Sequence, residues 1–268
     1  MKKFLAIAAA AAMLIAAAGC SQTANETEGT ASDLAYVKDN GMLKIGYTVI
    51  NPLNYTDDNG ELTGFETDFA AAVCEKLGVE PEFHEIDWNS KEMELEAKTI
   101  DCIWNGLTID EDRKAAMSIT TPYLENRQVL IMRAEDEAKY TDSVDGANVV
   151  AEASSAGDEL AVSDEFFANA NYTDVQSQAT ALMEVAAGTA DVAVIDYVMA
   201  TGSVGEGTDF DKLTFVDKDF ESEQYGIAFR KGSDITDEVN SIITELVNDG
   251  TLKEIADKYE LTPLLIAE

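Results

Sequence analysis

Residues 101–113 (DCIWNGLTIDEDR) have the types and spacing to hold a carboxylate group. A predicted strand ends within this segment, a hydroxyl group follows in the loop, and an arginine lies in the first turn of a predicted helix; the residues are Asn105, Gly106, Thr108, Asp110 as the N-cap, and Arg113,. Ligands of open α/β sheets bind beyond the carboxyl ends of the strands, where a helix N-terminus offers unpaired N–H groups. Arginine adds a planar clamp for carboxylates. Alternatively, Arg113 could be a surface residue that pairs with its acidic neighbours.

Two further segments also place polar residues where a predicted strand ends. In residues 149–157 (VVAEASSAG), Ser155 is a predicted N-cap with Asp158 three residues later, and the N–H groups of this turn could meet the same carboxylate,. An ordinary capped helix explains this segment equally well. In residues 188–197 (GTADVAVIDY), Asp196 ends a buried strand at the same predicted sheet edge. A carboxylate at that position could receive the ammonium group of a ligand.

The composition and motifs exclude several other functions. The formal net charge of −34 opposes binding to nucleic acid, and no Lys/Arg cluster is present for anionic lipid,. The sequence has no CxxC or HExxH motif, and its one histidine, His84, lies in an alternating strand pattern, so we predict no metal and no cofactor. Cys74 and Cys102 lie in apolar stretches typical of a core, and a bridge between them cannot be deduced from the sequence,.

The first twenty residues have the pattern of a secretory signal. A positive start is followed by the apolar run 4–18 and then by Gly19 and Cys20,. The run is shorter than the roughly 20 apolar residues of a membrane-spanning helix. The ending resembles the lipobox of bacterial lipoproteins, in which Cys20 becomes the lipid-modified first residue of the mature chain. We therefore expect a signal peptide at 1–19, a lipidated cysteine and flexible linker at 20–32, and an extracytoplasmic protein anchored to the cell membrane by lipid.

Alternating strands and helices must position the polar segments. The predicted strands cover residues 43–49, 82–86, 102–105, 128–132, 147–151, 173–176, 192–195, 213–216 and 225–230. Predicted helices lie between many of them, among them 65–77 with Gly78 as its stop, and two more, 235–249 and 252–259, end the chain,. This alternation is typical of parallel sheets with helices on both faces, and its two successive series indicate two lobes.

Five segments in this order resemble the polar amino-acid family of solute-binding proteins that serve ABC importers. They are Gly60–Asp68, Ile100–Arg113, Gly188–Tyr197, Tyr225–Lys231 and Asp249–Ile255. Each is a weak signal alone, whereas five in order behind a lipoprotein signal form a specific pattern. The resemblance implies an α/β fold of the periplasmic-binding-protein (Venus-flytrap) type. Each of its two lobes would be a mixed, mostly parallel sheet flanked by helices, and two strands would form the hinge.

The resemblance also implies where the lobes divide. Lobe 1 would comprise residues 33–132 plus 229–268, and lobe 2 would comprise residues 133–228. The hinge strands would cross near 131–133 and 227–229. We treat these boundaries as expectations.

A role for each site residue follows from the same resemblance. Arg113 would bind the α-carboxylate of a free amino acid, assisted by Thr108 and the Ser155 N–H. The Gly106 carbonyl group and Asp196 would hold the α-ammonium group. The remaining expected ligand-binding residues are Asn105, Ser154, Trp104 and Lys91.

Two departures from the family pattern affect this site. Ala153 occupies a position where the family usually has glycine, which puts the shape of the following turn in question. The family often has an aromatic residue after the first strand that stacks on the ligand, and here either Ile50 or Tyr55 could fill that place. Trp104 could supply the ring instead, or it could be a core residue.

Two residues of opposite charge leave the type of ligand side chain undecided. Lys91, on a short predicted helix, could favour a distal carboxylate, as in an acidic amino acid or cystine, or it could be solvated. Glu152, near the second polar segment, could instead suit a basic or polar ligand.

The function expected from these features is capture without chemistry. A monomer would bind a free amino acid between its lobes and deliver it to the permease of an ABC transporter. The alternatives are an enzyme on the same scaffold, similar to cyclohexadienyl dehydratase, or an amino-acid sensor. The sequence has no nucleophile–base pair and no cofactor motif for an enzyme,. For a sensor, we would expect a transmembrane or signalling segment to follow Glu268, and we expect none.

Overall fold

The computed structural model describes residues 32–266. The expected signal peptide, Cys20 and the linker up to residue 31 lie outside the described residues. Within the described part, no helix has the length and apolarity needed to cross a membrane.

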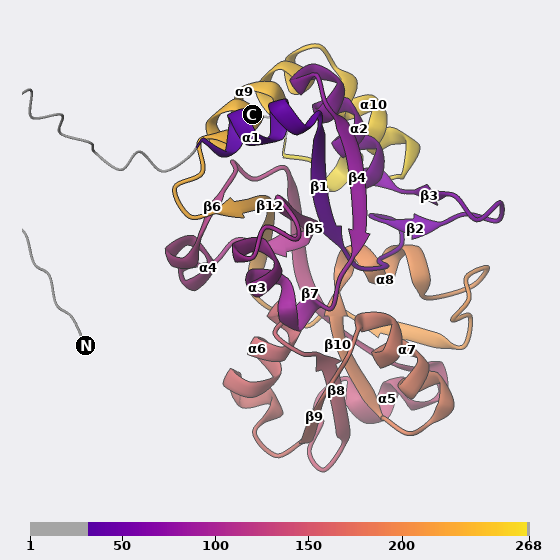
Figure 1. The fold of residues 1–268 in the computed structure, drawn as a ribbon. Helices are drawn as coiled ribbons and strands as arrows, with labels where there is room; N and C mark the ends of the chain where they lie inside the picture. The colour runs from indigo at the N-terminus through magenta and orange to yellow at the C-terminus, as the bar shows by residue number, and fades with distance from the viewer. Residues whose placement is uncertain (1–31, 267–268) are drawn as a thin grey trace, which may run out of the picture. The chain divides into compact units, whose positions relative to one another are not determined.

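Ten strands of the described part form one mixed sheet (Figure 1). They are β1 (Met42–Tyr47), β4 (Glu80–Glu85), β5 (Cys102–Thr108), β6 (Met117–Ile119), β7 (Leu124–Arg133), β8 (Asn148–Glu152), β9 (Asn171–Val175), β10 (Val192–Asp196), β11 (Leu213–Val216) and β12 (Ser222–Arg230). The main path runs β4-β1-β5-β12-β7-β10-β8-β9, with β6 paired to β12 and β11 paired to β7. A separate small hairpin joins β2 (Tyr55–Thr56) to β3 (Leu62–Thr63).

Within residues 32–266, ten α-helices flank the sheet. They are α1 (Asp33–Asn40), α2 (Phe65–Leu77), α3 (Lys91–Glu96), α4 (Glu111–Ala116), α5 (Glu137–Tyr140), α6 (Ala156–Ser163), α7 (Gln178–Ala187), α8 (Tyr197–Ser203), α9 (Ile235–Asn248) and α10 (Thr251–Lys258). Short 3₁₀ turns cover Trp88–Ser90, Ala134–Asp136, Glu165–Phe167 and Thr262–Leu264. In Figure 1, α1, α2, α9 and α10 lie around β1 and β4, whereas α5, α6 and α7 lie around β8, β9 and β10. The predicted α/β class is confirmed.

Strands β7 and β12 connect the two halves of the sheet. They pair with each other through residues 124–127 and 222–225. The later part of β7 pairs with β10 and β11, whereas the later part of β12 pairs with β5 and β6. The residues through which β7 and β12 pair lie earlier in each strand than the expected hinge segments 131–133 and 227–229, and the hinge itself stays a prediction. Parallel pairs lie toward the two ends of the sheet and antiparallel pairs at its centre.

Local sequence explains the element ends that matter for the site. Helix α2 matches the prediction of residues 65–77, and it ends because Gly78 adopts the left-handed conformation (φ 79°) that closes a helix C-terminus,. Helix α9 buries Val239, Ile243 and Leu246 against the sheet at the three- and four-residue spacing of one helix face,.

Cys74 and Cys102 are buried and unbridged, which confirms the interpretation of both as core residues.

Candidate functional site

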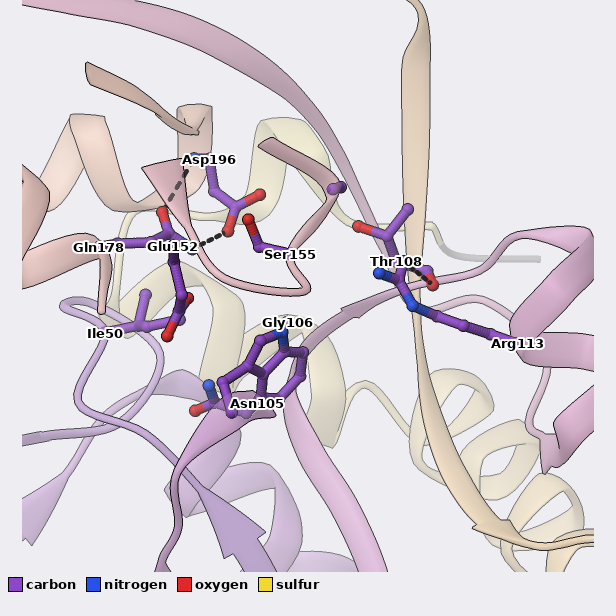
Figure 2. A pocket seen from close by; sticks show the side chains of 11 residues that line it. Ile50, Asn105, Gly106, Thr108, Arg113, Glu152, Ser155, Gln178 and Asp196 are labelled. Atoms are coloured by element: carbon purple, nitrogen blue, oxygen red, sulfur yellow. Dashed lines mark hydrogen bonds between the residues drawn. The ribbon is translucent and has the colours of Figure 1, made fainter. Parts of the chain in front are cut away.

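A pocket lies where β5, β8 and β10 end, at the boundary between the two halves of the sheet (Figure 2). Both halves contribute to its wall, which consists of Ile50, Trp88, Asn105, Gly106, Thr108, Arg113, Glu152, Ser155, Ala156, Gln178 and Asp196. The three polar segments identified in the sequence thus meet in one place. The enclosed space holds roughly one water molecule, so a larger ligand requires the two walls to separate,.

Arg113 is buried at one end of this pocket. Its backbone N–H donates to the Asp110 carboxylate at 2.7 Å, which confirms the predicted N-cap of α4. The guanidinium donates through Nη1 to the Thr108 carbonyl at 3.1 Å and through Nη2 to Glu159 Oε1 at 2.7 Å. Asp110 Oδ2 lies 2.7 Å from Nη1 as an ion pair. Because a guanidinium has five N–H groups, donors remain for a ligand carboxylate. Arg113 is therefore not a surface residue.

Asp196 is buried at the end of β10, where three side-chain amides donate to its carboxylate. Its Oδ1 accepts hydrogen bonds from Asn126 Nδ2 and Gln128 Nε2, both at 2.7 Å, and its Oδ2 accepts from Gln178 Nε2. Burial raises the pKa of Asp196, although the hydrogen bonds from Gln178 and Gln128 oppose this shift,. A nearby ammonium group would favour its ionised form.

Glu223 is a second carboxyl group beside Asp196, half-buried, that no sequence motif indicated. Its Oε2 accepts from Thr108 Oγ1 at 3.0 Å and shares the donors Asn126 and Gln128 with Asp196, at 3.0 and 3.2 Å. Burial, followed by the charge of Asp196, raises the pKa of Glu223 to about 7. A hydroxyl group has one hydrogen to donate. In this geometry Thr108 Oγ1 therefore offers a ligand an acceptor, rather than the donor expected for the carboxylate.

Ser155 and Ser154 form the start of α6. Ser155 Oγ accepts from the Asp158 N–H at 3.1 Å, which confirms the predicted N-cap, and the residue lines the pocket. Ser154 lies outside the lining. Its backbone N–H donates to Asp158 Oδ2 at 2.8 Å, and its hydroxyl donates to Asn89 at 2.7 Å. The left-handed residue of this turn is Ser154 (φ 60°), so Ala153 needs no glycine-like backbone.

Gly106 and Asn105 line the pocket from the end of β5. Gly106 has a φ of 58°, in the left-handed region, and its N–H donates to Glu66 Oε1 at 2.8 Å,. Asn105 Nδ2 donates to Thr48 Oγ1 at 2.6 Å. Burial raises the pKa of Glu66 to about 7, against hydrogen bonds from Tyr123, Gly106 and Asn54. Glu66, on α2, thus holds the Gly106 backbone in position. The sequence pattern did not indicate this contact.

Trp104 is a core residue and not part of the pocket. Its ring is 1% exposed and packs edge-on against Phe69, with centroids 5.0 Å apart. Because side chains alternate along a strand, Trp104 points away from its neighbour Asn105, which lines the site. The ligand-site expectation for Trp104 is corrected. The aromatic lining residue is Trp88, and Ile50 rather than Tyr55 is the lining residue from the loop after β1.

Lys91 is buried but does not line the pocket. Its Nζ donates to the carbonyl groups of Trp88 at 3.3 Å and Ser154 at 3.0 Å, and lies 4.6 Å from the centre of the Trp88 ring. Burial, followed by the charge of Arg113, lowers the pKa of Lys91 to about 8. Both earlier interpretations need correction, since this amine is neither solvated nor directed at the site. The hydrogen bond from Lys91 to the Ser154 carbonyl connects α3 to the start of α6.

Comparison with known proteins identifies the family. Residues 43–262 match the model of the bacterial extracellular solute-binding proteins, family 3, and the chain belongs to this family. It is 29% identical over 232 residues to the L-cystine-binding protein TcyJ of Escherichia coli (strain K12), which covers 83% of this chain and 84% of that protein. It is 28% identical to the ABC transporter glutamine-binding protein GlnH of Bacillus subtilis (strain 168), covering 97% of each chain.

One solved structure shows the same fold with a ligand named in its description. This is an ABC uptake transporter substrate-binding protein from Streptococcus pneumoniae with bound histidine. The TM-score is 0.81 at 26% identity, and the match covers 86% of this chain and 97% of that one. The two-lobed solute-binding fold expected from the sequence is thereby confirmed.

Proposed function

We propose that the protein captures a free amino acid between the two halves of its sheet and delivers it to an ABC-transporter permease without catalysing a reaction. One observation supports this most: Arg113 and Asp196 come from opposite halves of the sheet and line one buried pocket. An amino-acid ligand is supported by relatives named as cystine-binding and glutamine-binding proteins, and by a similar structure with bound histidine.

The charges of the pocket suit a zwitterion. Burying a charged group is unfavourable unless it is paired and hydrogen-bonded. Arg113, with the N–H groups at the start of α6, would meet the α-carboxylate. Asp196 and the Thr108 hydroxyl oxygen would accept from the α-ammonium group. Each end of the ligand backbone thus has a partner of opposite sign.

Ligand entry requires movement, because the enclosed space holds only about one water molecule,. We propose that the halves separate at the β7–β12 crossing, through residues 124–127 and 222–225. Two hinge strands of this kind can absorb the backbone rotation of domain closure. The lobe boundaries would then lie at this crossing, and bound ligand would favour the closed form.

We propose that the protein is located outside the cytoplasmic membrane. The family is extracellular by description, and the signal pattern with Cys20 supports export and lipid attachment,. We propose that it acts as a monomer without a cofactor.

A thermal-shift screen of the purified protein tests the binding function. The probes are the common L-amino acids and L-cystine, with the α-amide of each hit as control, because the amide lacks the carboxylate. At 100 times its dissociation constant a ligand adds about 2.7 kcal/mol of stability, which raises Tm by roughly 5–10 °C for a chain of this size. Failure of every amino acid to raise Tm would contradict the proposal. Recovery of a hit chemically changed after incubation would show an enzyme instead.

A further inference from the structure

We infer that Glu152 selects the side chain of the ligand, and that the ligands of this protein are amino acids whose side chain ends in a cationic hydrogen-bond donor, a guanidinium or an ammonium group. This inference rests on the proposed function, since it takes the α-carboxylate and α-ammonium groups to be held by Arg113 and Asp196. It resolves the two opposite expectations raised by Lys91 and Glu152 in the sequence.

Glu152 is a buried acid with no hydrogen-bond partner for one of its oxygens. It ends β8, is 2% exposed and lines the pocket. Among residues 32–266, no donor reaches its Oε1. The nearby Gln178 amide acts on the Glu152 carboxyl group as a hydrogen-bond donor that lowers its pKa, but its Nε2 also donates to Asp196, and Glu152 Oε1 still has no partner. A buried acceptor without a donor is unfavourable, so a ligand that brings the donor gains affinity.

The position of Glu152 fits a side-chain contact. In Figure 2, Arg113 and Thr108 stand at one end of the pocket, and Glu152, Gln178 and Ile50 stand at the other. An amino acid whose carboxylate meets Arg113 would extend its side chain toward Glu152. Ile50 and Trp88 contribute apolar surface to the pocket wall, suited to the methylene groups of a long basic side chain,.

The charges around this end of the pocket favour a cation. Asp196 on β10 and Asp87 before the Trp88 turn raise the negative potential at Glu152, and Lys91 on α3 is the positive group that acts on it. The Lys91 amine donates to two carbonyl oxygens and does not line the pocket. A distal carboxylate on the ligand would therefore face acidic groups without a cation to pair with.

The protonation of Glu152 adds a signature that distinguishes a cation from a neutral donor. Burial, followed by the charge of Asp196, raises the pKa of Glu152 to about 8, while Lys91 partly opposes the shift. A bound guanidinium or ammonium group favours the ionised acid, so binding near pH 7 releases a proton. The affinity for such a ligand then rises as pH increases from 6 toward 8 and levels off above that range. A neutral side chain does not require this release.

Calorimetric titration with matched probes tests the inference. L-Arginine and L-citrulline have the same length and shape, but citrulline ends in a neutral urea group; L-lysine and L-ornithine serve as ammonium probes, and L-glutamate and L-cystine as carboxylate-bearing ones. We expect at least one cationic probe to bind about 10-fold or more tightly than citrulline, glutamate and cystine. In Glu152→Gln, which keeps the size of the side chain, that preference and the proton release measured in two buffers should disappear. The control Glu159→Gln removes a charge at the Arg113 end and should leave the ratio unchanged.

The outcomes separate this inference from the function on which it rests. Equal or tighter binding of citrulline, glutamate or cystine by the wild-type protein overturns the selectivity of Glu152, while amino-acid capture stands. An unchanged arginine-to-citrulline ratio in a folded Glu152→Gln protein also overturns it. If no amino acid binds the wild-type protein, amino-acid capture itself is wrong.

Discussion

The guanidinium of Arg113 already has an acidic partner within the protein. Glu159 lies 2.7 Å from Nη2, and its side chain is 58% exposed. A ligand carboxylate at Arg113 would stand close to this negative charge, and like charges at short range repel. Glu159 would therefore weaken ligand binding at the proposed Arg113 site.

Replacing Glu159 with glutamine should strengthen ligand binding. Because exposed ion pairs are worth no more than about 1 kcal/mol, we expect the affinity to rise by roughly two- to five-fold. Calorimetric titration with the best ligand of the thermal screen measures this. Glu111→Gln is the matched control, since that exposed acid on α4 pairs with Lys114 and not with Arg113. A weaker complex in Glu159→Gln would show that the Arg113–Glu159 pair helps to close the pocket.

The pocket residues that could be predicted from the sequence share one property: their position follows from local chain geometry. Arg113, Asp196 and Ser155 each lie where a strand ends or a helix begins, and the structure brings these positions together. Glu66 and Glu223 reach the site from α2 and β12 through tertiary packing, and nothing in their own segments indicates it.

At the scale of single elements, long periodic segments were predictable and short ones were not. Helix α2 has a clear helical period and a glycine stop, and its bounds match the prediction,. Strands β2 and β3 have two residues each, which is too short for an alternating pattern,. The register in which β7 and β12 pair could not be read from either strand alone, because register depends on partners distant in sequence,.

The start of α6 depends on Ser155. Its hydroxyl group caps the helix through the Asp158 N–H, at the place where the ligand carboxylate would meet the N-terminus. We expect Ser155→Ala to lower the free energy of unfolding by about 1 kcal/mol, because this cap is lost, and to weaken ligand binding as well. Urea denaturation and calorimetry measure the two effects. Ser155→Asp should preserve the cap and stability but repel the ligand carboxylate. Full stability in Ser155→Ala would mean that the capping bond contributes little.

At the scale of the whole molecule, buried acids should make stability fall as pH rises. The pKa is raised to about 7 for Glu66 and Glu223 and to about 8 for Glu152. The folded protein therefore holds protons that the unfolded chain releases near the ordinary pKa of glutamic acid, about 4.3. This contribution is complete below that value and is lost as pH rises through 7 to 8.

We expect Tm to be several degrees higher at pH 5 than at pH 8, since a loss of about 1 kcal/mol lowers Tm by roughly 2–4 °C for a chain of this size. Differential scanning calorimetry across this range measures the slope. In Glu223→Gln, whose amide oxygen can still accept from Thr108, the slope should be shallower. A Tm that increases from pH 5 to pH 8 would contradict this account.

The most direct test of the central claim is a calorimetric titration of the best ligand into Arg113→Ala beside the wild-type protein. Removing one partner of a buried charge pair costs about 2 kcal/mol or more, so the affinity should fall by at least roughly 30-fold. Lys114→Ala, which removes the neighbouring exposed cation, should bind as the wild type does. A folded Arg113→Ala protein with wild-type affinity would show that this guanidinium does not hold the ligand.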